Sequence, residues 1–67
     1  MSIEKIGENA GNIWTTLKQN GKMSTSSLKK STHLNEKDVN MSLGWLAREN
    51  KLSFEHKGKQ TLISLTE

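Results

Sequence analysis

Apolar residues recur every three or four positions near the start of the chain, which is the period of an α-helix. Asn20 and Gly21 follow this stretch, and glycine readily takes the left-handed conformation that ends helices. The pattern therefore predicts a first helix over residues 3–20. Its apolar positions are Ile3, Ile6, Ala10, Ile13, Trp14 and Leu17.

The middle of the chain contains two further helical segments joined by a tight connection. Ser24 is a suitable N-cap for a short helix over residues 25–31. Asn35 and Asp38 occupy the N-cap and N3 positions of a third helix, which ends near Asn50. Two helices separated by about four residues form a helix-turn-helix. The apolar stripe of the third helix is Val39, Leu43, Leu46 and Ala47.

The period of the pattern then changes from helical to alternating. Leu52 and Phe54 occupy alternate positions before a turn at Lys57-Gly58-Lys59, and apolar residues return at alternate positions over residues 61–65. This alternation predicts a β-hairpin. A short strand near Met23 is expected to pair with the hairpin as a third member.

Three helices followed by a hairpin is the order of the winged helix-turn-helix fold. We therefore expect a single α+β domain over residues 1–67, without internal repeats or linkers. The expected core consists of Ile6, Ala10, Ile13, Trp14, Leu17, Leu28, Leu34, Val39, Leu43, Leu46, Leu52, Phe54, Ile63 and Leu65.

Three glycines lie inside predicted helices, where each costs about 1 kcal/mol relative to alanine. We expect Gly7 and Gly11 of the first helix to let a second helix approach closely. Gly44 of the third helix has several interpretations. It lets another backbone approach closely, packs against Gly11, or simply weakens its own helix.

Two segments of the chain resemble a known family. They are Ile6-Gly7-Glu8-Asn9-Ala10-Gly11-Asn12-Ile13-Trp14 and Ser42-Leu43-Gly44-Trp45-Leu46-Ala47-Arg48-Glu49-Asn50-Lys51. They are similar to a family of small prokaryotic winged-helix domains of unknown function, and the resemblance spans nearly the whole chain. It implies the winged-helix fold. For function it implies only a DNA-binding or regulatory role, because the family carries no defined activity.

Composition narrows the possible classes of protein. The chain has 67 residues, of which 31% are hydrophobic, and it has no cysteine, so we expect a thin core without disulfides or a large enclosed substrate pocket. No apolar stretch approaches the ~20 residues of a membrane span, and the N-terminus lacks the basic and apolar regions of a secretory signal. These features predict a cytoplasmic protein that does not enter a membrane.

The residue types used in catalysis lack the spacing that catalysis requires. His33 and His56 stand apart from other residues at metal-ligand spacing. Glu36 and Asp38 are better explained as first-turn carboxylates, which the helix dipole favours. The glycines form no phosphate-binding loop. The sequence therefore predicts no enzyme activity, no metal and no cofactor.

The net charge of +3 favours an anionic partner, and the third helix offers a face for one. Because a helix turns 100° per residue, four residues lie on the face opposite the apolar stripe: Lys37, Met41, Gly44 and Arg48. Asn40 lies to one side of this outward face. We expect double-stranded DNA to bind with this helix in the major groove and the wing on the backbone. The predicted contact residues are Lys29, Lys30, Lys37, Asn40, Arg48, Lys57 and Lys59.

Charge also limits the expected strength of DNA binding. From Glu36 to Glu49 two cations face three carboxylates, whereas from Lys51 to Lys59 three cations face one carboxylate. With about five phosphate contacts, binding by one copy is expected to be weak at cellular salt, so a dimer or larger assembly is needed. The alternative is that these lysines form only a solvated face that keeps the protein soluble.

Met41 and Trp45 are apolar residues one helical turn apart, turned away from the main stripe. In one interpretation the hairpin covers Trp45 through Phe54 or Leu62 and buries it within the monomer. In the other, Met41 and Trp45 bind a protein partner or a second copy, together with the exposed edge of the hairpin. The second interpretation makes the chain a protein-interaction module instead of a DNA-binding one.

Overall fold

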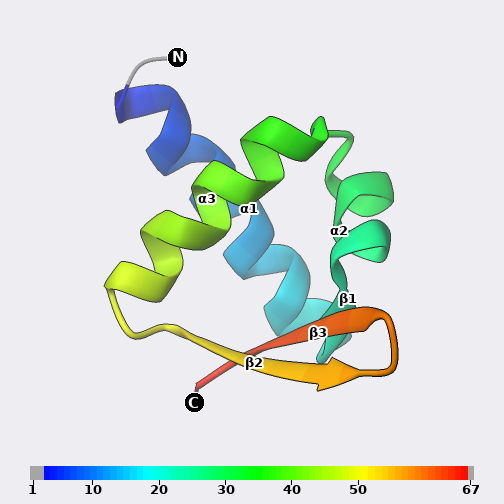
Figure 1. Cartoon of the computed structure of the whole chain (residues 1–67). Helices are drawn as coiled ribbons and strands as arrows, with labels where there is room; N and C mark the ends of the chain where they lie inside the picture. The colour runs from blue at the N-terminus through cyan, green and yellow to red at the C-terminus, as the bar shows by residue number, and fades with distance from the viewer. Residues whose placement is uncertain (1–2, 67) are drawn as a thin grey trace.

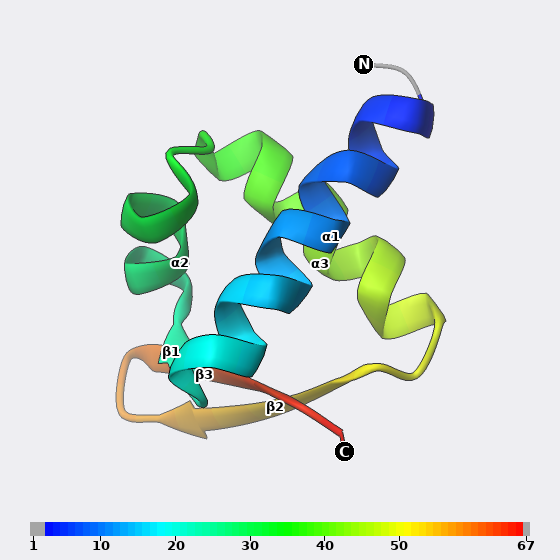
Figure 2. The same cartoon turned by 180° about the vertical axis from the view of Figure 1, so that it is seen from behind.

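Three α-helices lie on one face of a small antiparallel sheet (Figure 1). The computed structural model describes residues 3–66. Seen from the front and from behind, α1 and α3 cross each other above the sheet, and α2 stands beside them (Figure 2). The elements are α1 (Ile3–Asn20), β1 (Met23–Ser24), α2 (Thr25–Thr32), α3 (Glu36–Arg48), β2 (Leu52–Lys57) and β3 (Gln60–Leu65). This order agrees with the helices and hairpin that the sequence predicts.

The ends of the helices are fixed by the residues that the sequence indicates. The Ser27 N–H donates to Ser24 Oγ at 3.2 Å, and the Asp38 N–H donates to Asn35 Oδ1 at 2.8 Å. Each bond satisfies a backbone donor that the first turn of a helix leaves free. Asn50 takes the left-handed conformation with φ 59°, just beyond the C-terminus of α3.

The predicted third strand forms, and it decides which strand is central. The strand order is β1-β3-β2, with Met23 opposite Ile63 and Phe54 also opposite Ile63. β2 and β3 are joined by a two-residue turn in which Gly58 has φ 63°, a value that glycine adopts without strain. β3 therefore has a neighbour on each side, whereas β2 forms an outer edge.

The core lies between the helices and the inner face of the sheet. Ile13, Leu28 and Ile63 are fully buried, so α1, α2 and β3 all contribute to one cluster. Trp14, Leu34 and Leu65 are partly buried against it, and Ile6 is half-buried. The other buried apolar residues are Ala10, Leu17, Val39, Leu43, Leu46 and Leu52.

Phe54 does not belong to this core, and the prediction that it would is wrong. Its side chain is 46% exposed, although its cross-strand partner Ile63 is completely buried. Partners in an antiparallel pair point to the same face of the sheet. The difference arises because Ile63 lies on the central strand below the helices, whereas Phe54 lies on the edge strand.

The expected packing role of the helical glycines is also wrong. A Cβ added at Gly7, Gly11 or Gly44 would meet no atom of the described residues within 4 Å beyond its own local backbone. These glycines therefore do not bring α1 and α3 together. Gly7 and Gly11 instead line an open groove between the two helices.

Candidate nucleic-acid interface

The outward face of α3 carries the residues that the helical rotation assigns to it. Val39 and Leu43 are buried, whereas Lys37, Asn40 and Arg48 are exposed. Met41 is 38% exposed on the same face, and Gly44 is exposed between the polar positions. A helix that is firmly packed on one side thus presents a polar face with one accessible stretch of backbone at Gly44.

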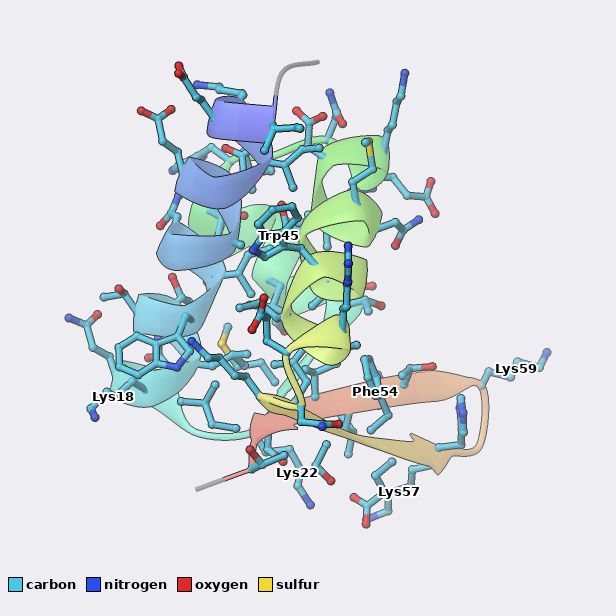
Figure 3. All side chains as sticks on the ribbon, turned by 90° about the vertical axis from the view of Figure 1, so that its left-hand side faces the viewer. Lys18, Lys22, Trp45, Phe54, Lys57 and Lys59 are labelled. Carbon is cyan, nitrogen blue, oxygen red and sulfur yellow. The ribbon has the colours of Figure 1, made fainter. Side chains whose placement is uncertain are left out.

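The wing places cations at the far end of the sheet. Lys57 ends β2, and Lys59 lies in the turn (Figure 3). Both side chains are exposed, and both extend from the side of the molecule where the hairpin ends (Figure 3). The wing therefore projects positive charge beyond the helices, as a contact to a phosphate backbone requires.

Two further predicted cations lie on α2. Lys29 and Lys30 occupy its last turn and are exposed, while Leu28 beside them is buried and anchors the helix. Helix α2 precedes α3 in the helix-turn-helix, so these lysines belong to the helix that crosses the DNA backbone in such motifs.

Ion pairs within residues 3–66 leave the predicted cations unpaired. Lys5 Nζ lies 3.7 Å from Glu8 Oε2, and Lys22 Nζ lies 2.9 Å from Glu55 Oε2. Lys18 Nζ lies 4.9 Å from the centre of the Trp14 ring. None of the six predicted cations has an ion-pair partner among the described residues: Lys29, Lys30, Lys37, Arg48, Lys57 and Lys59.

Carboxylates gather at the opposite end of α3 from Arg48. Glu36 and Asp38 lie in the first turn, where negative charge interacts favourably with the helix dipole. Their charge opposes that of Lys37 for any approaching phosphate. The first turn of α3 therefore carries net negative charge, whereas its last turn carries Arg48 and leads into the wing.

Trp45 packs between helices and not under the hairpin, so the expected cover by Phe54 or Leu62 is wrong. It is half-buried and lies between α1 and α3 (Figure 3). It lines a groove of ≈ 440 Å³ together with Gly7, Ala10, Gly11, Trp14, Thr15, Leu46 and Lys51. Met41 remains on the outward face, so the two apolar residues face different surroundings.

The histidines occupy positions with local structural explanations. His33 caps the C-terminus of α2 in the left-handed conformation, with φ 59°. His56 lies on β2 with its Nδ1 3.3 Å from Thr61 Oγ1 of the paired strand. Within residues 3–66 no three His, Cys, Asp or Glu side chains gather as a metal site would need. None of the helices in that range is long and apolar enough to cross a membrane.

The sequence interpretation missed Phe54 as a surface residue. Alternation along β2 correctly gives the face to which its side chain points, but alternation alone contains no information about which strand is central. The short strand at Met23 was the available signal, because a strand that pairs with β3 leaves β2 at the edge. An exposed aromatic side chain is consequently part of the wing.

A helix-turn-helix followed by a β-hairpin, with an outward third helix and a cationic wing, defines the winged-helix class. Residues 1–65 match the family model described as "Winged helix-turn-helix domain (DUF2582)". The chain belongs to this family. The resemblance seen in the sequence is thereby confirmed, together with the α+β winged-helix fold.

Similar proteins extend over nearly the same length. The chain is 39% identical over 64 residues to the uncharacterized protein MJ1608 of Methanocaldococcus jannaschii, covering 91% of this chain and 90% of that protein. It is also similar to the solution NMR structure of protein BT2368 from Bacteroides thetaiotaomicron, with a TM-score of 0.87 and 32% identity. That match covers 97% of this chain and 79% of the other. Winged-helix families are typically DNA-binding and non-enzymatic, and they commonly bind DNA or proteins.

Proposed function

We propose that this chain is a non-enzymatic DNA-binding module that inserts α3 into the major groove and lays the wing on the backbone. The observation that supports it best is the set of unpaired, exposed cations on α2, α3 and the wing. Lysines used only for solubility are equally exposed, but here the cations lie on the two helices of the helix-turn-helix and on the wing. This arrangement favours a partner with regularly spaced negative charge.

Each part of the interface has a distinct role in this proposal. Lys37 and the lysines of α2 and the wing contact phosphates and fix the orientation of the domain. Asn40 has the amide geometry that matches an adenine edge. Arg48 reaches a guanine edge or a phosphate from the last turn of α3. Gly44 lets the helix backbone approach the groove floor, because it carries no side chain.

The charge of α3 makes binding by a single copy weak. Its carboxylates offset its cations, so affinity depends on the wing and α2, and two copies on neighbouring sites would be needed for tight binding. With about five phosphate contacts, the logarithm of the binding constant should fall with the logarithm of salt concentration with a slope of about −4.5.

A fluorescence anisotropy titration of a labelled mixed-sequence duplex tests the proposal. The expected result is saturable binding at low salt that weakens with this slope as salt is raised. A matched titration with Lys5→Ala serves as a control, because Lys5 lies at the start of α1, outside the proposed interface. Absence of binding at low salt, or a slope near zero, would contradict DNA binding by this chain.

A second candidate function is protein binding through Met41 and Trp45. It is supported by the exposure of Met41 and by the groove that Trp45 lines against α1. Aromatic residues and methionine are enriched at protein interfaces, and the partner would be another protein or a second copy. Replacing Trp45, which lines that groove and not the outward face of α3, with alanine should then abolish a partner complex or a dimer, measured by light scattering, while leaving the affinity for DNA largely intact.

A further inference from the structure

Phe54 is a large aromatic side chain on the edge strand β2, where the fold leaves it exposed. It is the one phenylalanine of the chain, and 46% of its surface is accessible. Within residues 3–66 the other exposed large hydrophobic side chains are Ile3 at 71% and Met41 at 38%. A polar residue at an edge-strand position would protect the sheet better against association with other strands. Phe54 therefore has a surface that favours contact with a partner.

The surroundings of Phe54 show what kind of partner fits. Hairpin register places Phe54 and His56 on the inner face of the sheet, opposite Ile63 and Thr61. Between residues 52 and 65 that face carries no carboxylate. The one acidic residue of the hairpin, Glu55, points to the outer face and is paired with Lys22 at 2.9 Å. An anionic partner thus meets no carboxylate of the hairpin on the side of Phe54.

Cations lie close to Phe54 along the chain. Lys57 and Lys59 follow it at the wing tip. Figure 3 shows Phe54 rising from the sheet on the side of α3, Lys59 extending from the turn, and Lys57 on the opposite face of the sheet, which it shares with Glu55. Arg48 stands in the last turn of α3, just before the connection into β2. An exposed ring between the end of a helix and a cationic turn can act as a stacking platform. Cations contact the DNA backbone, and the ring stacks on a base.

We propose that Phe54 stacks on an unpaired nucleobase, so that this chain prefers DNA in which a duplex adjoins a single-stranded end. The inference rests on the proposed DNA binding and specifies its substrate. In an intact duplex the base faces are covered by their neighbours, and exposing one costs a few kcal/mol. An unpaired base offers its face without that cost. Phe54 then adds affinity only where a single strand begins.

The preference for a duplex with a single-stranded end follows because the outward face of α3 and the edge of β2 are separate surfaces. The outward face of α3 suits the major groove of a duplex, whereas the edge of β2 has no strand beyond it and is open on its outer side. A strand that leaves the duplex near Arg48 would pass along β2 toward Lys57 and Lys59. Contacts to phosphate alone would hold this single strand whether or not a base stacks on Phe54. The contribution of the Phe54 ring to affinity must therefore be measured separately.

Two matched DNA probes separate these contributions. One is a blunt duplex, and the other is the same duplex with a short thymine overhang. We expect wild-type protein to bind the overhang duplex about tenfold more tightly than the blunt one, the size typical of one base stacked on an aromatic ring. Phe54→Ala and Phe54→Leu should remove this preference while leaving the affinity for the blunt duplex unchanged. Phe54→Tyr should retain it, because the ring remains.

Ile3→Ala is the control for loss of an exposed apolar side chain, since Ile3 is 71% exposed at the start of α1. Phe54→Trp gives a direct readout, because its indole N–H signal should shift with the overhang duplex while the Trp14 signal stays in place. The backbone NMR spectrum of each variant establishes that it is folded. Equal binding of the two probes by wild type, or a preference that survives in Phe54→Ala, would overturn the role of Phe54. Failure of wild type to bind either probe would overturn DNA binding itself.

Discussion

Helix α3 and the wing reach the same proposed partner by different means. α3 is fixed by buried residues on one side, and its cations are offset by carboxylates in its first turn. The wing is held by few buried residues, Leu52 and Ile63 among them, but its tip carries lysines that have no ion-pair partner within residues 3–66. The comparison teaches that the two tasks of a DNA-binding domain are divided here. In the proposed DNA-binding mode, α3 would supply shape and base contacts, and the wing would supply charge.

The largest expected effect concerns how tightly side chains of α3 and of the wing are packed. Leu43→Ala removes a buried side chain from α3 and leaves a cavity, which should lower the free energy of unfolding by about 2–5 kcal/mol. Phe54→Ala in the wing should cost much less, because half of its surface is already exposed. Urea unfolding followed by circular dichroism measures both. Equal losses for the two variants would contradict the assignment of Phe54 to the surface.

The second prediction concerns the positive charge at the tip of the wing. Lys57→Ala combined with Lys59→Ala should weaken binding to a duplex on the order of tenfold at low salt and reduce the salt slope by about 2. The free energy of unfolding should stay nearly unchanged, because both side chains are exposed and make no ion pair within residues 3–66. Anisotropy titrations at several salt concentrations give the slope. An unaltered slope would show that the wing does not touch phosphates.

The third prediction compares one glycine from each region. Gly44→Ala should raise the free energy of unfolding by about 0.5–1 kcal/mol, because a Cβ meets no described atom there and alanine favours the helix. Gly58→Ala should lower it, because φ 63° strains any residue with a Cβ. Thermal unfolding of the two variants checks the opposite signs. In the DNA-binding account, Gly44→Ala should also weaken duplex binding despite the added stability.

The smallest expected effect concerns the negative charge in the first turn of α3. Glu36→Gln removes an exposed carboxylate beside Lys37 and should strengthen duplex binding about twofold, since it relieves repulsion of phosphate. It should also cost about 0.3–1 kcal/mol of stability, because the carboxylate interacts favourably with the N-terminus of α3. Binding and urea unfolding are measured on the same sample. Unchanged binding would mean that the first turn of α3 does not face DNA.

Helices, caps and the outward face of α3 were predictable because each depends on residues close together in the sequence. Ser24 and Asn35 cap their helices through bonds to residues three positions later, and the exposure of Lys37 and Arg48 follows from helical rotation alone. The resemblance to a known family gave the same fold independently.

The surroundings of Phe54 and Trp45 were not predictable, because they depend on contacts between distant segments. Phe54 is exposed because β1 pairs with β3 and leaves β2 at the edge. Trp45 meets α1 because of the angle at which α1 and α3 cross, which local periodicity does not encode. The glycines of α1 were misassigned for the same reason. A helical glycine is conspicuous in a sequence, but its neighbour in space is not.

The central claim is that α3 and the wing together form a DNA-binding face, and mapping the contact residue by residue tests it most directly. Isotope-labelled protein is titrated with a mixed-sequence duplex at low and at physiological salt while backbone amide and indole signals are followed by two-dimensional NMR. The account predicts shifts confined to α2, the outward face of α3 and the wing tip, and these shifts should shrink as salt rises. Signals that stay unmoved at low salt, or shifts confined to the Trp45 groove, would contradict it.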